Sequence, residues 1–179
     1  MEFSTQTLAH AAAITEHFKA TFSASEGNDE GALIGALATR LIRETPAEDL
    51  RGVSAWDRGE LLGTIFFTRL SFPNDSRCVF MLSPVAVATA HQGKGVGQRL
   101  ISHGLDLLRK EGVDIVVTYG DPAYYGRVGF LPVSEVDLPA PQPLSMPEGW
   151  IAQSLTDVPL APIKGPSRCV AAFDDPALW

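Results

Sequence analysis

The sequence predicts an α/β (α+β) fold with a mixed, mostly antiparallel central sheet flanked by helices. Two stretches carry this prediction. Apolar strand-like runs on either side of Asp57-Arg58-Gly59-Glu60 have the pattern of an antiparallel hairpin with a glycine-containing turn. Residues 79–119 have the pattern of a strand, a helix and a second strand, which is a βαβ unit with a right-handed crossover. Because the hairpin is antiparallel and the crossover pair is parallel, the sheet must be mixed.

Periodicity and turn residues place the elements before the hairpin. In chain order we expect a short strand over residues 2–6, a helical face from Leu8 to Phe22, a loop over Ser25–Asp29 and a second helix carrying Leu33, Ile34, Leu37, Leu41 and Ile42. Either Thr7 or Thr5 is the expected cap of the first helix. The second helix should end before Pro46, because the residue before a proline avoids the helical conformation.

The remaining elements follow in the same way. The expected order is hairpin strands Leu50–Trp56 and Leu61–Leu70, a turn at Phe72–Ser76, a strand Val79–Val87, a helix from about Gly95 to Lys110, a strand Val113–Tyr119, one or two helical turns over Pro122–Val128, and late strands Trp150–Leu155 and Cys169–Phe173. Pro84 cannot donate to a sheet, so its strand is either bulged there or lies at an edge.

Composition limits the class of protein. A chain of 179 residues is expected to form one domain, residues 1–179, with an adequate core. The net charge of −7 argues against nucleic acid as a partner and mildly favours a neutral or cationic substrate such as an amine. The sequence has neither a signal-peptide pattern nor an apolar run of the ~18 residues that a membrane span needs, so we expect a cytoplasmic protein without a membrane partner.

Neither the cysteines nor the histidines suggest a metal site. Cys78 and Cys169 are far apart and stand in strand-like surroundings, so we expect buried free thiols; nothing in their spacing requires a disulfide. The four histidines have no metal-ligand spacing with these cysteines.

The most informative segment is the glycine turn, residues 92–97, which stands between the apolar run ending at Val87 and a helical pattern. Gly93, Gly95 and Gly97 would let an anion approach the free N–H groups of a helix start, where the helix dipole also favours negative charge. A flexible loop is the alternative, but a strand directly before the glycines and a helix directly after them favour a phosphate site. Lys94 and Arg99 could add positive charge, although Arg99 also suits a solvated surface.

Two other phosphate motifs fail on spacing. A dinucleotide-binding fingerprint needs Gly-x-Gly-x-x-Gly, and Gln98 stands where its third glycine should be. A P-loop needs Gly-Lys followed by Ser or Thr, and Lys94 is followed by Gly95.

Gln92, Gly95 and Gly97 match the Gln/Arg-x-x-Gly-x-Gly/Ala pattern, and Tyr125 precedes Gly129-Phe130 as in Tyr-x-x-x-Gly-Phe. In these motifs the chain resembles the GNAT N-acetyltransferases, and the order of its expected elements matches their fold over about residues 3–155. The stretches 82–87 and 120–125 resemble the YhbS-like subgroup of predicted acetyltransferases.

The resemblance implies acetyl-CoA as the cofactor. It places the pantetheine arm against a splayed part of the signature strand, where it would bond to the backbone like a short extra strand. The implied cofactor-binding residues are Val85, Ala86, Val87, Gln92, Gly93, Lys94, Gly95, Val96 and Gly97.

The resemblance gives Tyr125 the role of general acid, which protonates the departing CoA thiolate. A tyrosine with an ordinary pKa near ~10 can donate to a leaving group of this kind. The alternative is that Tyr124 and Tyr125 pack on the sheet as helix residues, and for Tyr124 we favour that alternative. Gly129 and Phe130 are expected to mark a chain reversal and a core strand.

The general base is not identifiable from the sequence. Many GNAT enzymes carry a carboxylate on the signature strand, but here that strand reads Phe80-Met81-Leu82-Ser83-Pro84. Asp121 is one candidate, although an Asp-Pro step also suits a helix cap. Ser83 could hold a water, and Glu60 in the hairpin turn is expected to be solvated. An amine of low pKa would need only a water relay.

The leading hypothesis is an acetyl-CoA-dependent N-acetyltransferase in which a primary amine of a small molecule or peptide attacks the thioester directly. A catalytically silent CoA-binding sensor or interaction module is the alternative, motivated by the missing carboxylate. A nucleotide-binding domain is a third interpretation, weakened by the motif spacing. The sequence leaves the acceptor, the acyl chain length and the choice between monomer and homodimer open.

Overall fold

The computed structural model describes residues 1–179 and contains a mixed sheet of seven strands with four α-helices. The strands are ordered β1-β2-β3-β4-β5-β7-β6, with β4 and β5 parallel. The elements are β1 Glu2–Ser4, α1 Ala11–Glu26, α2 Asn28–Glu44, β2 Leu50–Asp57, β3 Glu60–Leu70, β4 Val79–Val87, α3 Val96–Lys110, β5 Ile115–Tyr119, α4 Pro122–Tyr125, β6 Leu131–Pro132 and β7 Trp150–Ser154. The predicted mixed sheet with one parallel βαβ unit is therefore confirmed.

The chain divides into two compact units. The first unit comprises residues 1–67 and 84–104, and the second comprises residues 68–83 and 105–179. The strands β3 and β4 and the helix α3 each contribute residues to both. No helix of the chain is long and apolar enough to cross a membrane.

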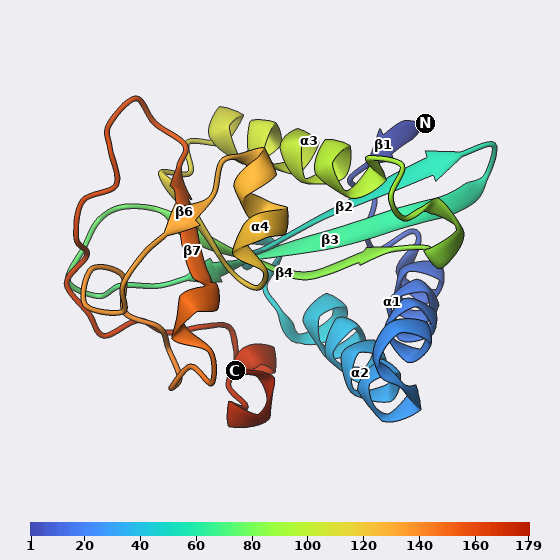
Figure 1. Cartoon of the computed structure of the whole chain (residues 1–179), viewed down its shortest axis with the longest axis horizontal. Helices are drawn as coiled ribbons and strands as arrows, with labels where there is room; N and C mark the ends of the chain where they lie inside the picture. The colour runs from blue at the N-terminus through green and yellow to red at the C-terminus, as the bar shows by residue number, and fades with distance from the viewer. The chain divides into compact units, whose positions relative to one another are not determined.

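In the first unit, helices cover both faces of the strands (Figure 1). The ring of Phe18 in α1 lies 5.1 Å from that of Phe66 in β3. The next strand residue points to the opposite face, because side chains alternate along a strand. There α3 packs directly on β3, since a Cβ on Gly104 would come within 2.5 Å of the Phe67 ring. The core of this unit thus lies in two layers, one on each side of β3.

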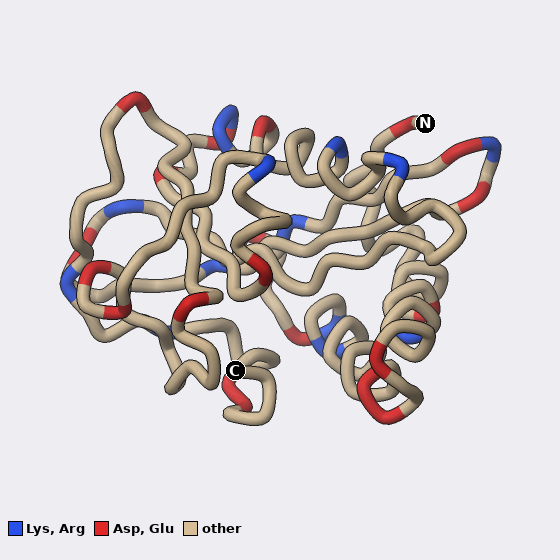
Figure 2. Tube along the Cα trace, viewed as in Figure 1, with Lys and Arg blue, Asp and Glu red and all other residues tan.

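The two N-terminal helices differ from the prediction at their ends. The loop expected over Ser25–Asp29 is reduced to Gly27, whose φ of 102° interrupts the helical path between α1 and α2. The acidic first turn of α2 suits the positive end of its helix dipole (Figure 2). Thr5 and Thr7 do not cap α1, which begins at Ala11 after His10, a residue that makes no side-chain cap hydrogen bond. The prediction failed here because Leu8, taken as a core residue, is 78% exposed.

The hairpin and the first strand are confirmed. Arg58 and Gly59 have φ values of 49° and 84°, and positive φ at both central residues is the type I′ geometry that matches the twist of the flanking strands. The strand β1 lies antiparallel to β2, with Phe3 opposite Ala55. Phe3 also stacks on His103 of α3 at 4.2 Å, which ties the start of the chain to that helix.

The second unit is built around β5 and β7. Val79 to Leu82 of β4 pair in parallel with Ile115 to Thr118, and β7 pairs antiparallel with β5 on its other side. Trp150 is fully buried, and its indole nitrogen donates to the carbonyl of Leu138 at 2.7 Å. The core strand expected at Phe130 is not found. Phe130 itself is buried, but the strand that follows it, β6, consists of two exposed residues at the edge of the sheet.

The late strand predicted over Cys169–Phe173 is wrong. Only Arg168 makes a bridge, to Ser71, and residues 171–173 form a 3₁₀ turn. The apolar residues of this segment are buried by aromatic packing instead of sheet pairing. The indole of Trp179 packs 6.4 Å from the ring of Phe173 and donates to its carbonyl at 2.9 Å.

Both cysteines are free thiols, as expected, but each is only half-buried. Cys78 accepts a hydrogen bond from Arg69 at 3.2 Å. The pKa of the Cys169 thiol is raised, mainly by burial, so the thiol stays protonated at neutral pH.

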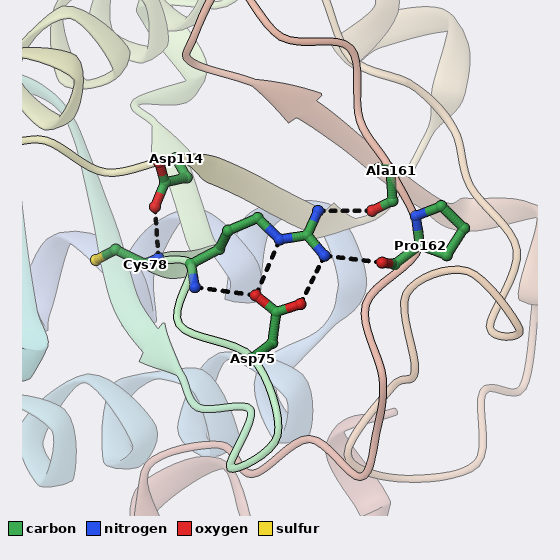
Figure 3. Close-up of polar contacts among 6 residues, drawn as sticks. Asp75, Cys78, Asp114, Ala161 and Pro162 are labelled. Atoms are coloured by element: carbon green, nitrogen blue, oxygen red, sulfur yellow. Dashed lines mark hydrogen bonds and ion pairs between the residues drawn. The ribbon is translucent and has the colours of Figure 1, made fainter.

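Arg77 connects the loop before β4 to the C-terminal segment (Figure 3). Its guanidinium binds both carboxylate oxygens of Asp75, at 2.9 and 2.7 Å, and donates to the carbonyls of Ala161 and Pro162, each at 2.8 Å. Beside it, the carboxylate of Asp114 accepts from the backbone N–H of Cys78 at 2.7 Å. The hydrogen bonds from Arg77 lower the pKa of Asp75 to about 2.

We expect Asp75→Asn to lower the free energy of unfolding at neutral pH by about 1–2 kcal/mol, because the variant loses a bidentate charged pair that is partly screened by solvent. Since the folded-state pKa is depressed, this stabilisation is complete above the ordinary value of 3.8 and is lost as the pH falls through about 2. Urea unfolding at pH 7, 4 and 3 should show the difference from wild type shrinking. Asp106→Asn, in an exposed helical pair, is the control and should change stability by less than about 0.5 kcal/mol.

Candidate functional site

The glycine turn is held firmly to the end of β4. The backbone N–H of Ala88 donates to the carbonyl of Leu62 on β3 at 2.9 Å, and a single 3₁₀ turn over Thr89–His91 follows. The side-chain amide of Gln92 then reaches back and donates to the carbonyl of Val87 at 3.0 Å. Gln92 therefore acts within this unit as a clamp between the turn and the strand.

The backbone of the glycine turn presents free donors. Gly93 and Gly95 have φ values of 71° and 75°, and the space where a Cβ would lie at each is open. The N–H of Arg99 makes the first helical bond, to the carbonyl of Gly95 at 3.1 Å, whereas the N–H groups of residues 93–98 have no backbone acceptor. Together with the dipole of α3, such a run of donors fits a phosphate or pyrophosphate group.

The charged side chains near the turn are largely engaged with the turn itself. The ammonium group of Lys94 donates to the carbonyl of Ala90 at 2.8 Å, so it stabilises the turn conformation. His91 lies 3.0 Å from the carboxylate of Glu60, which is 64% exposed. Val96 is buried, so it offers only its backbone N–H to the site. Any phosphate contact thus depends mainly on backbone groups.

We expect Gly95→Ala to destabilise the protein by about 1–2 kcal/mol, because a Cβ is unfavourable at positive φ even where there is space for it. The matched control is Gly126→Ala. That glycine also has open space around its Cβ position but has φ −57°, so the variant should be neutral or slightly stabilising. Thermal unfolding of both variants measures the contrast, and equal effects would show that the conformation of Gly95 carries no cost.

The strand β4 continues beyond its pairing with β5. The last paired residues are Leu82 and Thr118, while β4 runs on to Val87. The carbonyl of Leu82 accepts from the Thr118 hydroxyl at 2.8 Å. Pro84, two residues later, has no N–H to donate. Residues 85–87, predicted to contact the cofactor, therefore belong to the part of β4 that does not pair with β5.

Tyr125 is fixed by its neighbours in the second unit. It ends the one-turn helix α4, and its carbonyl accepts from the N–H of Phe130 at 3.3 Å. Its ring lies 5.8 Å from that of Phe130 and 5.1 Å from that of Tyr124, both edge-on. Gly129, in the left-handed conformation, makes the reversal that brings Phe130 back. This geometry explains the Tyr-x-x-x-Gly-Phe spacing.

The hydroxyl of Tyr125 is strongly biased toward its protonated form. Burial raises its pKa to about 12, with a smaller opposing effect from a hydrogen bond to the Thr118 side chain. Tyr125 is thus a proton-bearing donor at neutral pH, which is the state that a general acid requires.

The carboxylates considered as general bases are engaged elsewhere. Asp121 caps α4, where it accepts from the N–H of Ala123 at 2.8 Å, so the cap interpretation is confirmed. Glu60 is solvated and bound to His91. One buried polar residue was missed as a site candidate. Thr118 donates to the carbonyl of Leu82, but nothing in the local sequence signals this role.

Comparison with known proteins assigns the family. The model of the acetyltransferase (GNAT) domain matches residues 2–133. The chain belongs to the GNAT acetyltransferase family. The uncharacterized N-acetyltransferase YjhQ of Escherichia coli (strain K12) is 36% identical over 149 residues, which cover 79% of this chain and 81% of that protein. The predicted resemblance to this superfamily is thereby confirmed.

Solved structures agree with the fold. A GNAT family acetyltransferase from Brucella melitensis in complex with acetyl-CoA has a TM-score of 0.71 at 27% identity, with 97% of each chain covered. YhbS from Escherichia coli in complex with CoA also gives 0.71, at 24% identity, covering 91% of this chain and 88% of that one. Part of the chain is also 33% identical to YhbS of strain K12, over 97 residues that cover 54% of this chain and 58% of that protein.

Proposed function

We propose that this protein is an acetyl-CoA-dependent N-acetyltransferase that transfers the acetyl group directly to a primary amine. The free N–H groups of residues 93–98, which stand within a matching Gln92-Gly95-Gly97 signature, carry the proposal. A catalytic family and relatives crystallised with CoA or acetyl-CoA support it.

The proposed cofactor site comprises two stretches of the first unit. The glycine turn, with Gln92 as its clamp, would hold the pyrophosphate through backbone donors. Val85, Ala86 and Val87 would hold the pantetheine arm, since this part of β4 lies beyond the residues that pair with β5.

When bound, acetyl-CoA supplies an activated thioester. Backbone N–H groups near residues 85–87 polarise the carbonyl that the amine attacks. Tyr125 holds a proton at its hydroxyl oxygen and donates it toward the departing sulfur. The net exchange forms one C–N bond, breaks one C–S bond and moves one proton from nitrogen to sulfur. A thiol ordinarily has a pKa near ~8.5, so a phenol with a pKa of about 12 donates effectively only if the thiolate is desolvated as well.

The acceptor is proposed only as a chemical class. A net charge of −7 favours a neutral or cationic amine, either on a small molecule or on a peptide. A CoA-binding module without transferase activity is the second candidate, because β4 carries no carboxylate. Binding of acetyl-CoA without thiol release across a broad amine panel would favour this second candidate.

The first test is thermal stability with acetyl-CoA, with NAD and ATP as controls. A ligand at 100 times its Kd stabilises the native state by about 2.7 kcal/mol. We expect a clear rise in Tm with acetyl-CoA and CoA and none with the controls. The absence of a shift at millimolar acetyl-CoA would contradict the proposed cofactor site.

The second test compares Tyr125→Phe with Tyr124→Phe. Phenylalanine keeps the ring packing of Tyr125 and removes only the hydroxyl group that carries the proton, so kcat should fall by about 10²-fold or more with acetyl-CoA affinity unchanged. Tyr124 is the matched control, since it is adjacent and has no partner besides ring contact, and its variant should keep wild-type kcat. Thiol release from acetyl-CoA with a reactive amine measures both. Unchanged turnover in Tyr125→Phe would reject its role as general acid.

A further inference from the structure

The last turn of β7 has no partner strand on its outer side. The edge strand β6 lies beside β7 (Figure 1) but has only two residues, and Leu131 pairs with Ala152. Ser154, the last residue of β7, lies beyond this pairing. The chain does not extend β6 backward, because Gly129 has φ 96° and its N–H donates to the carbonyl of Gly126 at 3.2 Å. The end of β7 is therefore paired with β5 alone.

The hydrogen bonds of β7 show where the backbone groups of Ser154 point. The N–H of Leu155 donates to the carbonyl of Asp114 at 2.8 Å, on the side of β5, and the N–H of Val133 donates to the carbonyl of Trp150 at 3.1 Å, on the side of β6. Successive residues of an antiparallel strand bond alternately to one side and to the other. The N–H and carbonyl of Ser154 therefore point past the end of β6, where they have no backbone partner.

A cavity of about 670 Å³ lies at this place, which is within the usual size range of ligand sites. Its lining includes Ser154, the carboxylate residue Asp137, and the apolar residues Leu131, Leu160 and Pro162. The side chain of Leu131 is 70% exposed, so apolar surface is accessible next to the unpaired backbone groups. The cavity thus offers contacts both for the main chain and for the side chains of a ligand.

Hydrogen bonds fix the walls of the cavity in the free protein. The N–H of Ile163 donates to the carbonyl of Asp137 at 2.7 Å, which joins the loop after β6 to the C-terminal segment. The guanidinium of Arg77 holds the same segment through the carbonyls of Ala161 and Pro162 (Figure 3). A site that is formed in advance loses less conformational freedom when a ligand binds.

The charge of the cavity is negative. Asp137 is the only charged residue of the lining. Its Oδ2 atom accepts from the hydroxyl of Ser134 at 2.7 Å, and its Oδ1 atom accepts no hydrogen bond from the protein. The sequence has no lysine or arginine between Arg127 and Lys164. A lysine or arginine side chain of a ligand is therefore the complementary group.

The outer edge of β6 is unsuited to pairing with a second copy of the chain. Because Val133 bonds toward β7, the alternation makes Pro132 the β6 residue whose backbone faces outward. Proline has no N–H to offer to a neighbouring strand, and a proline on an edge strand opposes edge-to-edge association. The unpaired backbone at Ser154 is thus accessible to a short extended segment and not to a long strand.

The cavity is separate from the end of β5 that adjoins Tyr125. Ser154 lies opposite Ile115, the first residue of β5. Thr118, where the pairing of β4 with β5 ends, is three residues further along, which corresponds to about 10 Å in a strand. A ligand in this cavity therefore has a function beyond the proposed acetyl transfer, and the inference below does not depend on that activity.

We propose that this cavity is a docking site for an extended peptide segment of a partner protein that carries a lysine or arginine. One peptide residue pairs with Ser154 as a strand residue would: its N–H donates to the carbonyl of Ser154, and its carbonyl accepts from the N–H of Ser154. The basic side chain pairs with Asp137. Apolar side chains of the peptide contact Leu131 and Leu160.

The test selects a random peptide library displayed on phage against the immobilised full chain, and then measures binding of the selected peptides by fluorescence anisotropy. We expect the selected peptides to contain lysine or arginine. Asp137→Lys should weaken their binding by about 10-fold or more, because it brings like charges together. Glu148→Lys is the matched control, since it makes the same change of charge at an exposed position outside the cavity, and it should keep the wild-type affinity.

Ser154→Pro and Ser154→Ala separate the backbone contact from the side chain. Both variants lose the hydroxyl that donates to the carbonyl of Val158 at 2.6 Å, but only proline also removes the N–H. We expect the proline variant to bind the peptides about 10-fold more weakly than the alanine variant, because the peptide carbonyl is left without its donor. Equal affinities of the two variants would overturn the proposed main-chain pairing.

Hydrogen exchange of the wild-type protein, followed by NMR, decides the point in case the proline variant does not fold. The N–H of Ser154 should exchange rapidly in the free protein and become protected when a selected peptide is bound. The N–H of Leu155, which bonds to Asp114, should be protected in both states. An unprotected Ser154 in the complex, selected peptides without a basic residue, or a library without any enriched peptide would each overturn the proposal.

Discussion

The end of the β4–β5 pairing is the constraint on which the proposed site depends. Leu82 and Thr118 form the last pair of the two strands. The Thr118 hydroxyl donates to the carbonyl of Leu82, so that carbonyl keeps a hydrogen-bond partner where the strand pairing ends. Pro84 then removes one further donor. The rest of β4 keeps extended backbone that does not pair with β5, and a ligand amide can bond to such a strand as another strand would.

The same strand also delivers the glycine turn. The chain passes from Val87 to α3 within eight residues, and Gln92 holds this short connection to the strand end. The start of a helix offers free N–H groups by itself. The positive φ values at Gly93 and Gly95 extend this run of free N–H groups back into the turn that precedes the helix. The unpaired end of β4 and the proposed anion site are thus close together along the chain. This suits a ligand that combines a pyrophosphate with an amide-bearing arm.

Local signals predicted the elements that depend on local chemistry. The hairpin, the βαβ unit, the glycine turn and the Asp121 cap follow from turn residues, periodicity and spacing, and all were found. The late strand failed where aromatic packing, and not a periodic pattern, decides the outcome. Residues 169–173 are buried by the indole of Trp179 and not by a strand.

Burial sets the protonation state of the proposed general acid. Removing a group from water disfavours its charged form, which for tyrosine is the anion. Burial therefore raises the pKa of Tyr125 to about 12. At neutral pH the hydroxyl keeps its proton, which is the state that its proposed step consumes. The neighbouring rings of Tyr124 and Phe130 and the reversal at Gly129 hold this buried position, so packing and acid chemistry depend on the same contacts.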